Sequence, residues 1–159
     1  MSSDTPQLFR AHSTKYLKGA TGIITNPNLQ RRRRPRDLPI AVHQLLVDWF
    51  LMRFNVDYRG TSLFCTGDAA VAAGYRTSTS TLIAIEPVGE YSLCYSTKCK
   101  DLFGYYQFHW SATAPSAEKI QSDMDSLEFV HQRDGGLEAA AASGHEVMLV
   151  AVQFRYRLA

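Results

Sequence analysis

The segment Ser62-Leu-Phe-Cys-Thr-Gly-Asp-Ala-Ala-Val-Ala-Ala-Gly-Tyr75 is the part of the sequence that decides the fold. Residues 63–65 form a brief apolar run, which is typical of a buried strand. Turn residues follow, and Asp68 is a suitable cap for the exposed N–H groups of a helix. Residues 69–73 are rich in alanine and predict that helix. Because its side chains are small, the helix is expected to lie close against a sheet, with Tyr75 directly after it.

Hydrophobic periodicity divides the rest of the chain into strands and helices. We expect strands at 7–14, 56–61, 81–88, 91–95 and 145–157, and helices at 37–55, near 102, at 117–133 and at 137–142. The strands at 81–88 and 91–95 are predicted to be either an antiparallel pair or one continuous bent strand. Residues 15–30 are expected to be irregular, and Asp37 is expected to cap the helix that follows it. The pattern predicts an α+β fold.

The length of 159 residues suits one domain. We expect residues 1–36 to be an N-terminal strand and basic loop of that domain, and residues 37–159 to be its main body. No apolar leader and no membrane span are predicted. Three cysteines without regular spacing (Cys65, Cys94 and Cys99) indicate reduced thiols in a cytoplasmic protein and predict no metal site.

Five arginines lie close together in a basic segment interrupted by one proline; they are Arg31, Arg32, Arg33, Arg34 and Arg36. Such a run binds polyanions through phosphate contacts. Three interpretations remain open at this stage. The segment binds nucleic acid, or it holds the pyrophosphate of a dinucleotide or an acidic partner, or it is a solvated loop.

The first predicted strand carries Arg10 and His12 on one face. Two such side chains on the same side of a strand indicate either a solvent-facing edge or a functional site. At the other end of the chain, Glu146 stands alone at the beginning of a strongly apolar strand.

The segment 62–75 resembles the central strand, turn and small-residue helix of the ADP-ribosyltransferase fold. The resemblance implies an α+β fold with a mostly antiparallel split sheet and flanking helices, and it implies NAD as the cofactor. Phe-Arg-Ala-His-Ser at 9–13 is similar to the first strand of that family, so Arg10, His12 and Ser13 are expected to hold the ribose and phosphate side of NAD. The resemblance further implies that Tyr75 holds the nicotinamide ring and that Phe64 is one of the NAD-binding residues. It also implies that Glu146 stabilises the charge that develops as nicotinamide leaves.

Two features leave alternatives open within this family. Tyr58-Arg59-Gly60 also resembles the arginine motif of some members, and Ser78-Thr79-Ser80 resembles their Ser-Thr-Ser motif. Arg59 is therefore a second candidate for the ribose-side residue. In members that modify proteins, a Gln or Glu lies two residues before the catalytic Glu, whereas this chain has Gly144.

The overall pattern is also similar to small proteins encoded by tailed bacteriophages, which implies a phage or bacterial source. Three hypotheses follow. The protein is an NAD-dependent mono-ADP-ribosyltransferase that acts on a host protein or nucleic acid in the host cytoplasm. Alternatively, it is an inactive relative that serves as a virion or accessory protein and binds virion proteins. The third hypothesis is a nucleic-acid-binding module that uses residues 31–36.

Overall fold

The computed structural model describes residues 7–159 and has the α+β architecture expected from the sequence. The strands are β1 (Leu8–Ser13), β2 (Thr21–Thr25), β3 (Leu63–Thr66), β4 (Ser80–Ser96), β5 (Phe129–Arg133) and β6 (Glu146–Leu158). The helices are α1 (Ile40–Phe54), α2 (Tyr58–Thr61), α3 (Ala69–Ala73), α4 (Leu102–Tyr105), α5 (Ala117–Ser126) and α6 (Leu137–Ser143), and two short helical turns are η1 (Thr14–Tyr16) and η2 (Tyr106–Trp110).

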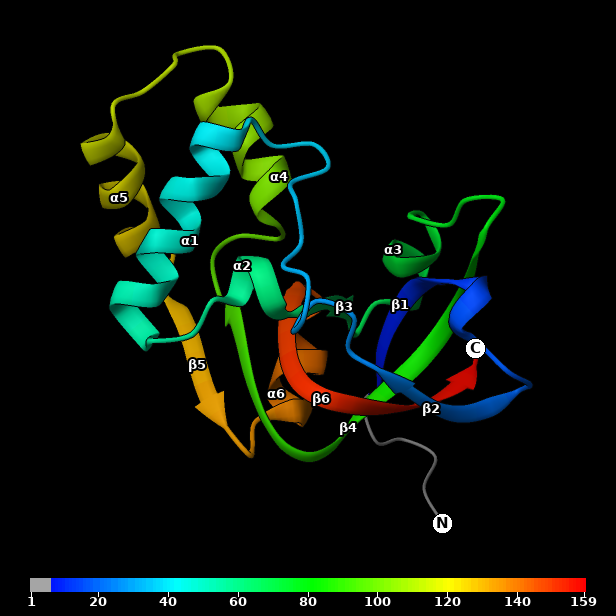
Figure 1. The fold of residues 1–159 in the computed structure, drawn as a ribbon. Coiled ribbons are helices and arrows are strands. Elements are labelled where there is room, and N and C mark those ends of the chain that lie inside the picture. Colours follow the sequence, from blue (N-terminus) through cyan, green and yellow to red (C-terminus); the bar gives the residue numbers. More distant parts are fainter. Residues whose placement is uncertain (1–6) are drawn as a thin grey trace.

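The strands form one curled sheet in the order β2-β6-β3-β1-β4-β5, with an additional pairing between β6 and β4. Every strand pair within residues 7–159 is antiparallel. Because β4 pairs with both β1 and β6, the circuit β1-β3-β6-β4 closes on itself. Figure 1 shows β4 and β6 as the two long, bent strands of the sheet, which lies below the helices α1, α4 and α5 in this view.

β4 is one continuous strand with a bend, which decides between the two alternatives that the sequence left open. Its register against β6 shifts between Val88 and Tyr91. Gly89 lies at this shift with a φ of 75°, a conformation that glycine adopts without steric cost. The first half of β4 pairs with β1, and the second half pairs with β5.

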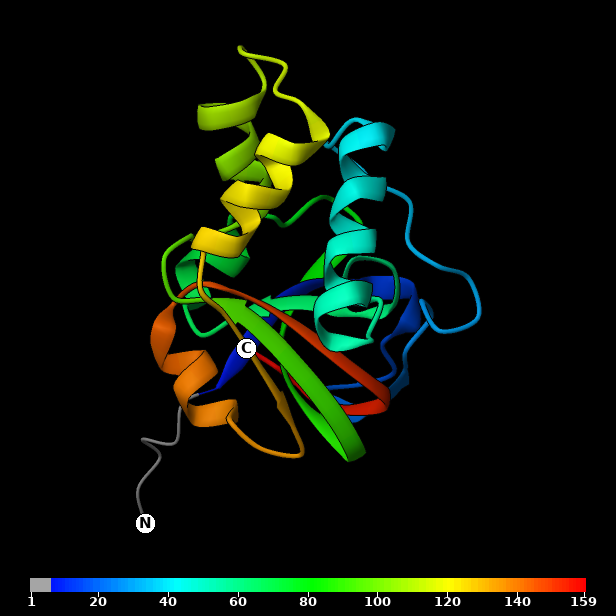
Figure 2. The ribbon, with the colours of Figure 1, turned by 90° about the vertical axis from the view of Figure 1, so that its left-hand side faces the viewer.

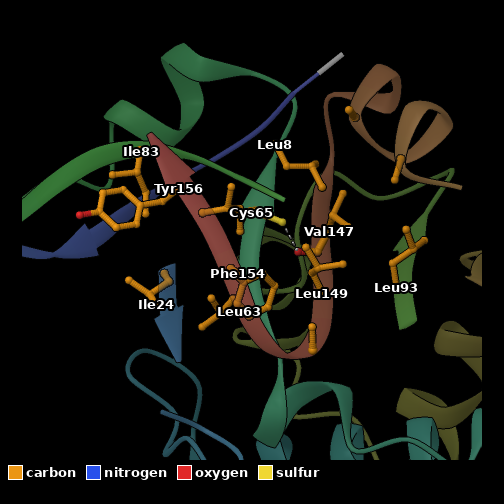
Figure 3. Packing of buried hydrophobic residues seen from close by; sticks show 14 of the residues in the cluster. Leu8, Ile24, Leu63, Cys65, Ile83, Leu93, Val147, Leu149, Phe154 and Tyr156 are labelled. Atoms are coloured by element: carbon orange, nitrogen blue, oxygen red, sulfur yellow. Dashed lines mark hydrogen bonds between the residues drawn. The ribbon is translucent and has the colours of Figure 1, made fainter. Parts of the chain in front are cut away.

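Apolar side chains from both long strands meet side chains of β1, β2 and β3 inside the curl of the sheet. Figure 3 shows Leu63, Leu149 and Phe154 among the residues that point toward one another there. Ala140 and Ala141 of α6 belong to the same cluster. Burial of these apolar surfaces supplies the main driving force for closing the sheet.

A second apolar cluster lies between the sheet and the helices α1, α4 and α5, which gather on one side of the molecule (Figures 1 and 2). Trp49 and Phe50 of α1 meet Met124 of α5 in this cluster. The indole nitrogen of Trp49 donates a hydrogen bond to Asp125 (2.9 Å), and that of Trp110 donates one to Asp123 (2.8 Å). No helix in the described part of the chain is long and apolar enough to span a membrane.

Several elements differ from the sequence prediction. The helix expected at 117–133 ends at Ser126, and 129–133 is the strand β5. Glu128 between them has a φ of 51°, which no α-helix accommodates. The run expected as a strand at 56–61 is helical at α2, because the Asp57 side chain accepts a hydrogen bond from the backbone N–H of Gly60.

Two further expectations for the first half of the chain were wrong. Residues 15–30 are not wholly irregular, since β2 pairs with β6 along five residues. Pro39, and not Asp37, stands at the N-cap of α1, and no side chain caps this helix.

Candidate functional site

A cavity of about 270 Å³ opens between β1, β3, the start of β6, α3 and the basic segment 31–36. Its lining brings together residues from both ends of the chain. The lining includes Phe9, Arg10, Ala11, Arg33, Pro35, Arg36, Asp37, Leu38, His43, Arg59, Phe64, Cys65, Thr66, Val71, Ala72, Tyr75, Lys100, Asp101, Phe103, Gly144 and Glu146. Five of these side chains are arginine or lysine and three are acidic, so the cavity favours an anionic ligand.

Strand register explains why Arg10 and Glu146 lie at the same cavity. β3 lies between β1 and β6, so that Thr66 pairs with Phe9 on one side and with Glu146 on the other. The Thr66 hydroxyl donates a hydrogen bond to the carbonyl of Gly144 (3.1 Å), and the Glu146 N–H donates one to the carbonyl of Lys100 (2.8 Å). These bonds fix the backbone at the beginning of β6.

The turn from β3 into α3 places Tyr75 at the cavity. The Asp68 side chain accepts hydrogen bonds from the N–H groups of Ala70 (3.0 Å) and Val71 (3.2 Å), which confirms the predicted cap. The helix ends at Gly74 as expected. Tyr75 lines the cavity and is 56% exposed, so one part of its ring is accessible to a ligand.

Glu146 carries the one carboxylate of β6, and it is held by an ion pair. Nη1 of Arg59 donates a hydrogen bond to its Oε1 at 3.2 Å, and both side chains are largely buried. Burial raises the pKa of Glu146 above its usual value, while Arg59 and Arg33 lower it and Asp101 raises it further. The Arg59 Nε is buried and has no hydrogen-bond partner within the described residues.

Phe64 lies between two guanidinium groups. The Arg33 group is 3.7 Å from the ring centroid, and the Arg59 group is 4.6 Å from it. Cation–π contact of this kind stabilises cations that have lost water. Phe64 therefore supports the arginines of the cavity, and its place among the NAD-binding residues stays a prediction.

Arg10 and His12 form a pair within β1. Nε of Arg10 donates a hydrogen bond to Nδ1 of His12 (3.0 Å), and Nη1 donates one to the carbonyl of Phe64 (2.8 Å). Burial and the charge of Arg10 lower the pKa of His12 to about 4, so the ring is neutral at physiological pH. Arg10 lines the cavity, whereas His12 is buried behind it and Ser13 lies at the far end of the strand.

The basic segment divides into held and exposed arginines. The backbone N–H of Arg33 donates a hydrogen bond to the carbonyl of Gly60 (2.8 Å), and its guanidinium donates one to the carbonyl of Ser62. Arg32 forms an ion pair with Asp57. The remaining three side chains are exposed: Arg31, Arg34 and Arg36.

Some cavity residues were not expected from the sequence. His43 is buried and lines the cavity, although the helical periodicity of α1 placed it off the apolar stripe. Asp101 and Phe103 come from the loop and helix α4 that follow β4, and their approach depends on pairing across the sheet. The sequence offered one signal for the turn at the start of α4, which is an Asp three residues before a Gly. In the structure Asp101 accepts a hydrogen bond from the N–H of Gly104 (2.6 Å).

Cys65 is the cysteine that lines the cavity, and it is buried. Burial raises the pKa of Cys65 to about 12, so this thiol is protonated and donates a hydrogen bond to the carbonyl of Val147. Residues 7–159 contain no group of three His, Cys, Asp or Glu side chains placed to hold a metal ion.

Comparisons of the chain with protein-family models, with curated proteins and with solved structures found no match.

Proposed function

We propose that this protein is an NAD-dependent mono-ADP-ribosyltransferase of bacterial or phage origin. The observation that carries the proposal is the meeting of Arg10, Tyr75 and Glu146 at one cavity, from a first strand, a helix end and a last strand. These are the residue types that the reaction needs: a cation for phosphate, an aromatic ring for the leaving group and an anion for developing positive charge.

The residues of the cavity fit NAD in charge, and the cavity fits the nicotinamide half of NAD in size. The unpartnered Nε of Arg59 and the guanidiniums of Arg10 and Arg33, which have no carboxylate partner within residues 7–159, suit phosphate or ribose oxygens. A volume of about 270 Å³ lies near the lower end of typical ligand pockets. The cavity therefore suits the nicotinamide half of NAD, with the adenosine half outside.

Each residue has a distinct role in this proposal. NAD, when bound, supplies a glycosidic bond to nicotinamide that breaks as positive charge develops on the ribose. Glu146 places a carboxylate where it stabilises that charge, and Arg59 orients the carboxylate through the 3.2 Å hydrogen bond. Tyr75 offers its exposed ring to the nicotinamide.

Nicotinamide release from NAD tests the proposal. We expect Glu146→Gln to lower the rate by about 100-fold or more, because the variant removes a charge from the site of developing positive charge. Glu138→Gln is the matched control, since Glu138 is exposed on α6 and does not line the cavity. Equal rates for the Glu146 variant and the wild type would contradict the proposal.

The ion pair between Glu146 and Arg59 also favours a second candidate, an inactive relative that serves as a virion or accessory protein. A carboxylate bound to a buried arginine has less freedom to respond to a substrate. The same assay separates the two candidates, because the inactive relative binds NAD or a partner without releasing nicotinamide.

A further inference from the structure

An unpaired positive surface lies beside the cavity. Arg31, Arg34 and Arg36 are exposed, and within residues 7–159 none of them forms an ion pair. Arg36 lines the cavity itself. Exposed Lys100 adds a further positive charge to the lining, from the loop before α4. We call these four residues the basic rim.

The basic rim is held in place by the fold. Arg33, in the middle of the segment, is anchored by its backbone to Gly60 and by its guanidinium to Ser62 and the Phe64 ring. Arg32 is tied to Asp57. These contacts anchor the backbone of the segment next to the cavity, so binding a polyanion there does not require ordering of a loose tail.

The acidic side chains of the lining cancel its positive charge only in part, because it holds five cationic and three acidic side chains. Asp101 accepts a hydrogen bond from the N–H of Gly104 and keeps its charge, and Glu146 is paired with Arg59. Asp37 is the remaining acid of the lining, and it is exposed between the arginines and α1. An acceptor side chain that is itself cationic is disfavoured by such a surface, whereas a phosphate backbone is attracted.

The size of the cavity is the second element of nucleic-acid recognition. With the nicotinamide ring on Tyr75, a volume of about 270 Å³ leaves space for an acceptor only at the mouth, beside the basic rim. A single strand whose phosphates contact the rim can present an unpaired base there. A paired base does not reach a cavity of this size without leaving its helix.

We propose that the acceptor of this site is a base of a single-stranded nucleic acid, held by the basic rim through its phosphates. This inference rests on the proposed function. In the transfer, the bond between nicotinamide and ribose C1′ breaks and its electron pair leaves with nicotinamide. A lone pair of a base nitrogen then forms the new bond to C1′. The nitrogen loses one proton to water, so NAD⁺ and the base give ADP-ribosyl base, nicotinamide and H⁺.

The test incubates the full chain with NAD labelled in its adenylate phosphate and with oligonucleotides of one mixed sequence. Single-stranded DNA, single-stranded RNA and the DNA duplex are compared, and nicotinamide release is measured in the same samples. A protein mixture is the alternative acceptor. The variant Arg31→Gln/Arg34→Gln removes two rim charges, and Arg133→Gln/Arg155→Gln removes two exposed charges that do not line the cavity.

We expect label on a single strand of DNA or RNA and at least tenfold less on the duplex. The rim variant is expected to lower transfer per nicotinamide released by about tenfold, and the control variant to leave it unchanged. Loss of two phosphate contacts also lowers the salt slope of strand binding by about 1.4. Release of nicotinamide with label only on protein, or on no acceptor, would overturn this inference and leave the proposed function intact. An absence of release under all conditions would overturn both.

Discussion

The pair of Arg59 and Glu146 controls the pH range in which the proposed reaction runs. In the proposed reaction Glu146 acts as an anion, so we expect activity to be lost as pH falls through its pKa, which burial has raised. Arg59 is the strongest influence that lowers this pKa, with Arg33 as a weaker one and Asp101 acting against both. The pH range of activity therefore depends on Arg59.

We expect Arg59→Gln to move the acid limb of nicotinamide release to higher pH, because the carboxylate loses its cation. Arg59→Lys keeps the charge and is expected to leave the limb near that of the wild type. The measurement is a pH profile of the release rate, compared at temperatures where circular dichroism shows each variant folded. An unshifted limb in Arg59→Gln would show that Glu146 is not the titrating group.

At the residue scale, the sequence could predict the identities of the cavity residues better than their roles. Arg10, Tyr75 and Glu146 stand at places where a strand or helix begins or ends, and the structure places all three at one cavity. The roles of Phe64 and His12 depend on neighbours distant in sequence. Phe64 meets Arg33 across a loop, and His12 accepts the Arg10 hydrogen bond instead of reaching the cavity.

At the scale of elements, the turn between β3 and α3 depends on a close contact with α6. A Cβ atom at Gly67 would lie 1.8 Å from the carbonyl oxygen of Ala141, which belongs to the backbone and cannot rotate away. We expect Gly67→Ala to destabilise the protein by about 2 kcal/mol or more, as overpacking does. It is also expected to weaken activity, since α3 carries Tyr75 into the cavity.

Gly135→Ala is the matched control for this change. A Cβ there would meet its nearest atom at 3.7 Å, which is ordinary van der Waals contact. Urea unfolding of the two variants measures the difference in the free energy of unfolding. Equal stability of Gly67→Ala and the wild type would mean that the turn and α6 are not in this contact.

Element types could be predicted where one local signal dominated. The Asp68 cap and the small-residue helix were predicted correctly because capping and composition act within a few residues. The end of α5 was missed because the apolar period of 3–4 residues continues past Ser126, while Glu128 adopts positive φ to let β5 join β4. Tertiary pairing overrode local preference there.

For the molecule as a whole, the long strands join its two apolar clusters into one folding unit. Val147 and Leu149 face the cluster inside the curled sheet, while Met148 belongs to the cluster under the helices. Both tryptophans lie in the helix-side cluster. Unfolding is therefore expected to be one cooperative transition, in which fluorescence and far-ultraviolet circular dichroism change together.

Phe154→Ala tests this coupling, because Phe154 is fully buried in the other cluster. We expect a loss of about 3–5 kcal/mol and a midpoint lower by roughly 10 °C, seen equally by both probes. Val152→Ala is the control, since Val152 is 63% exposed on the same strand, and its effect is expected to stay within about 0.5 kcal/mol. A tryptophan transition that stays at the wild-type temperature would mean that the clusters unfold separately.

The fold class could be predicted from the sequence, while the closure of the sheet could not. Alternating strands and amphipathic helices in one short chain indicate an α+β fold, which the structure confirms. Closure requires β4 to pair with β1 and β6 at once. The residues next to β4 in the sequence do not determine which strands lie beside it in the sheet.

Calorimetric titration of NAD into the full chain tests most directly the claim that this cavity is an NAD site. We predict saturable binding at one site. Tyr75→Ala is expected to weaken the affinity about tenfold, because the nicotinamide ring no longer stacks on the tyrosine ring. Tyr16→Ala serves as the control, since Tyr16 is 47% exposed and does not line the cavity. An absence of saturable heat at millimolar NAD, or equal affinity in the Tyr75 and Tyr16 variants, would contradict the account.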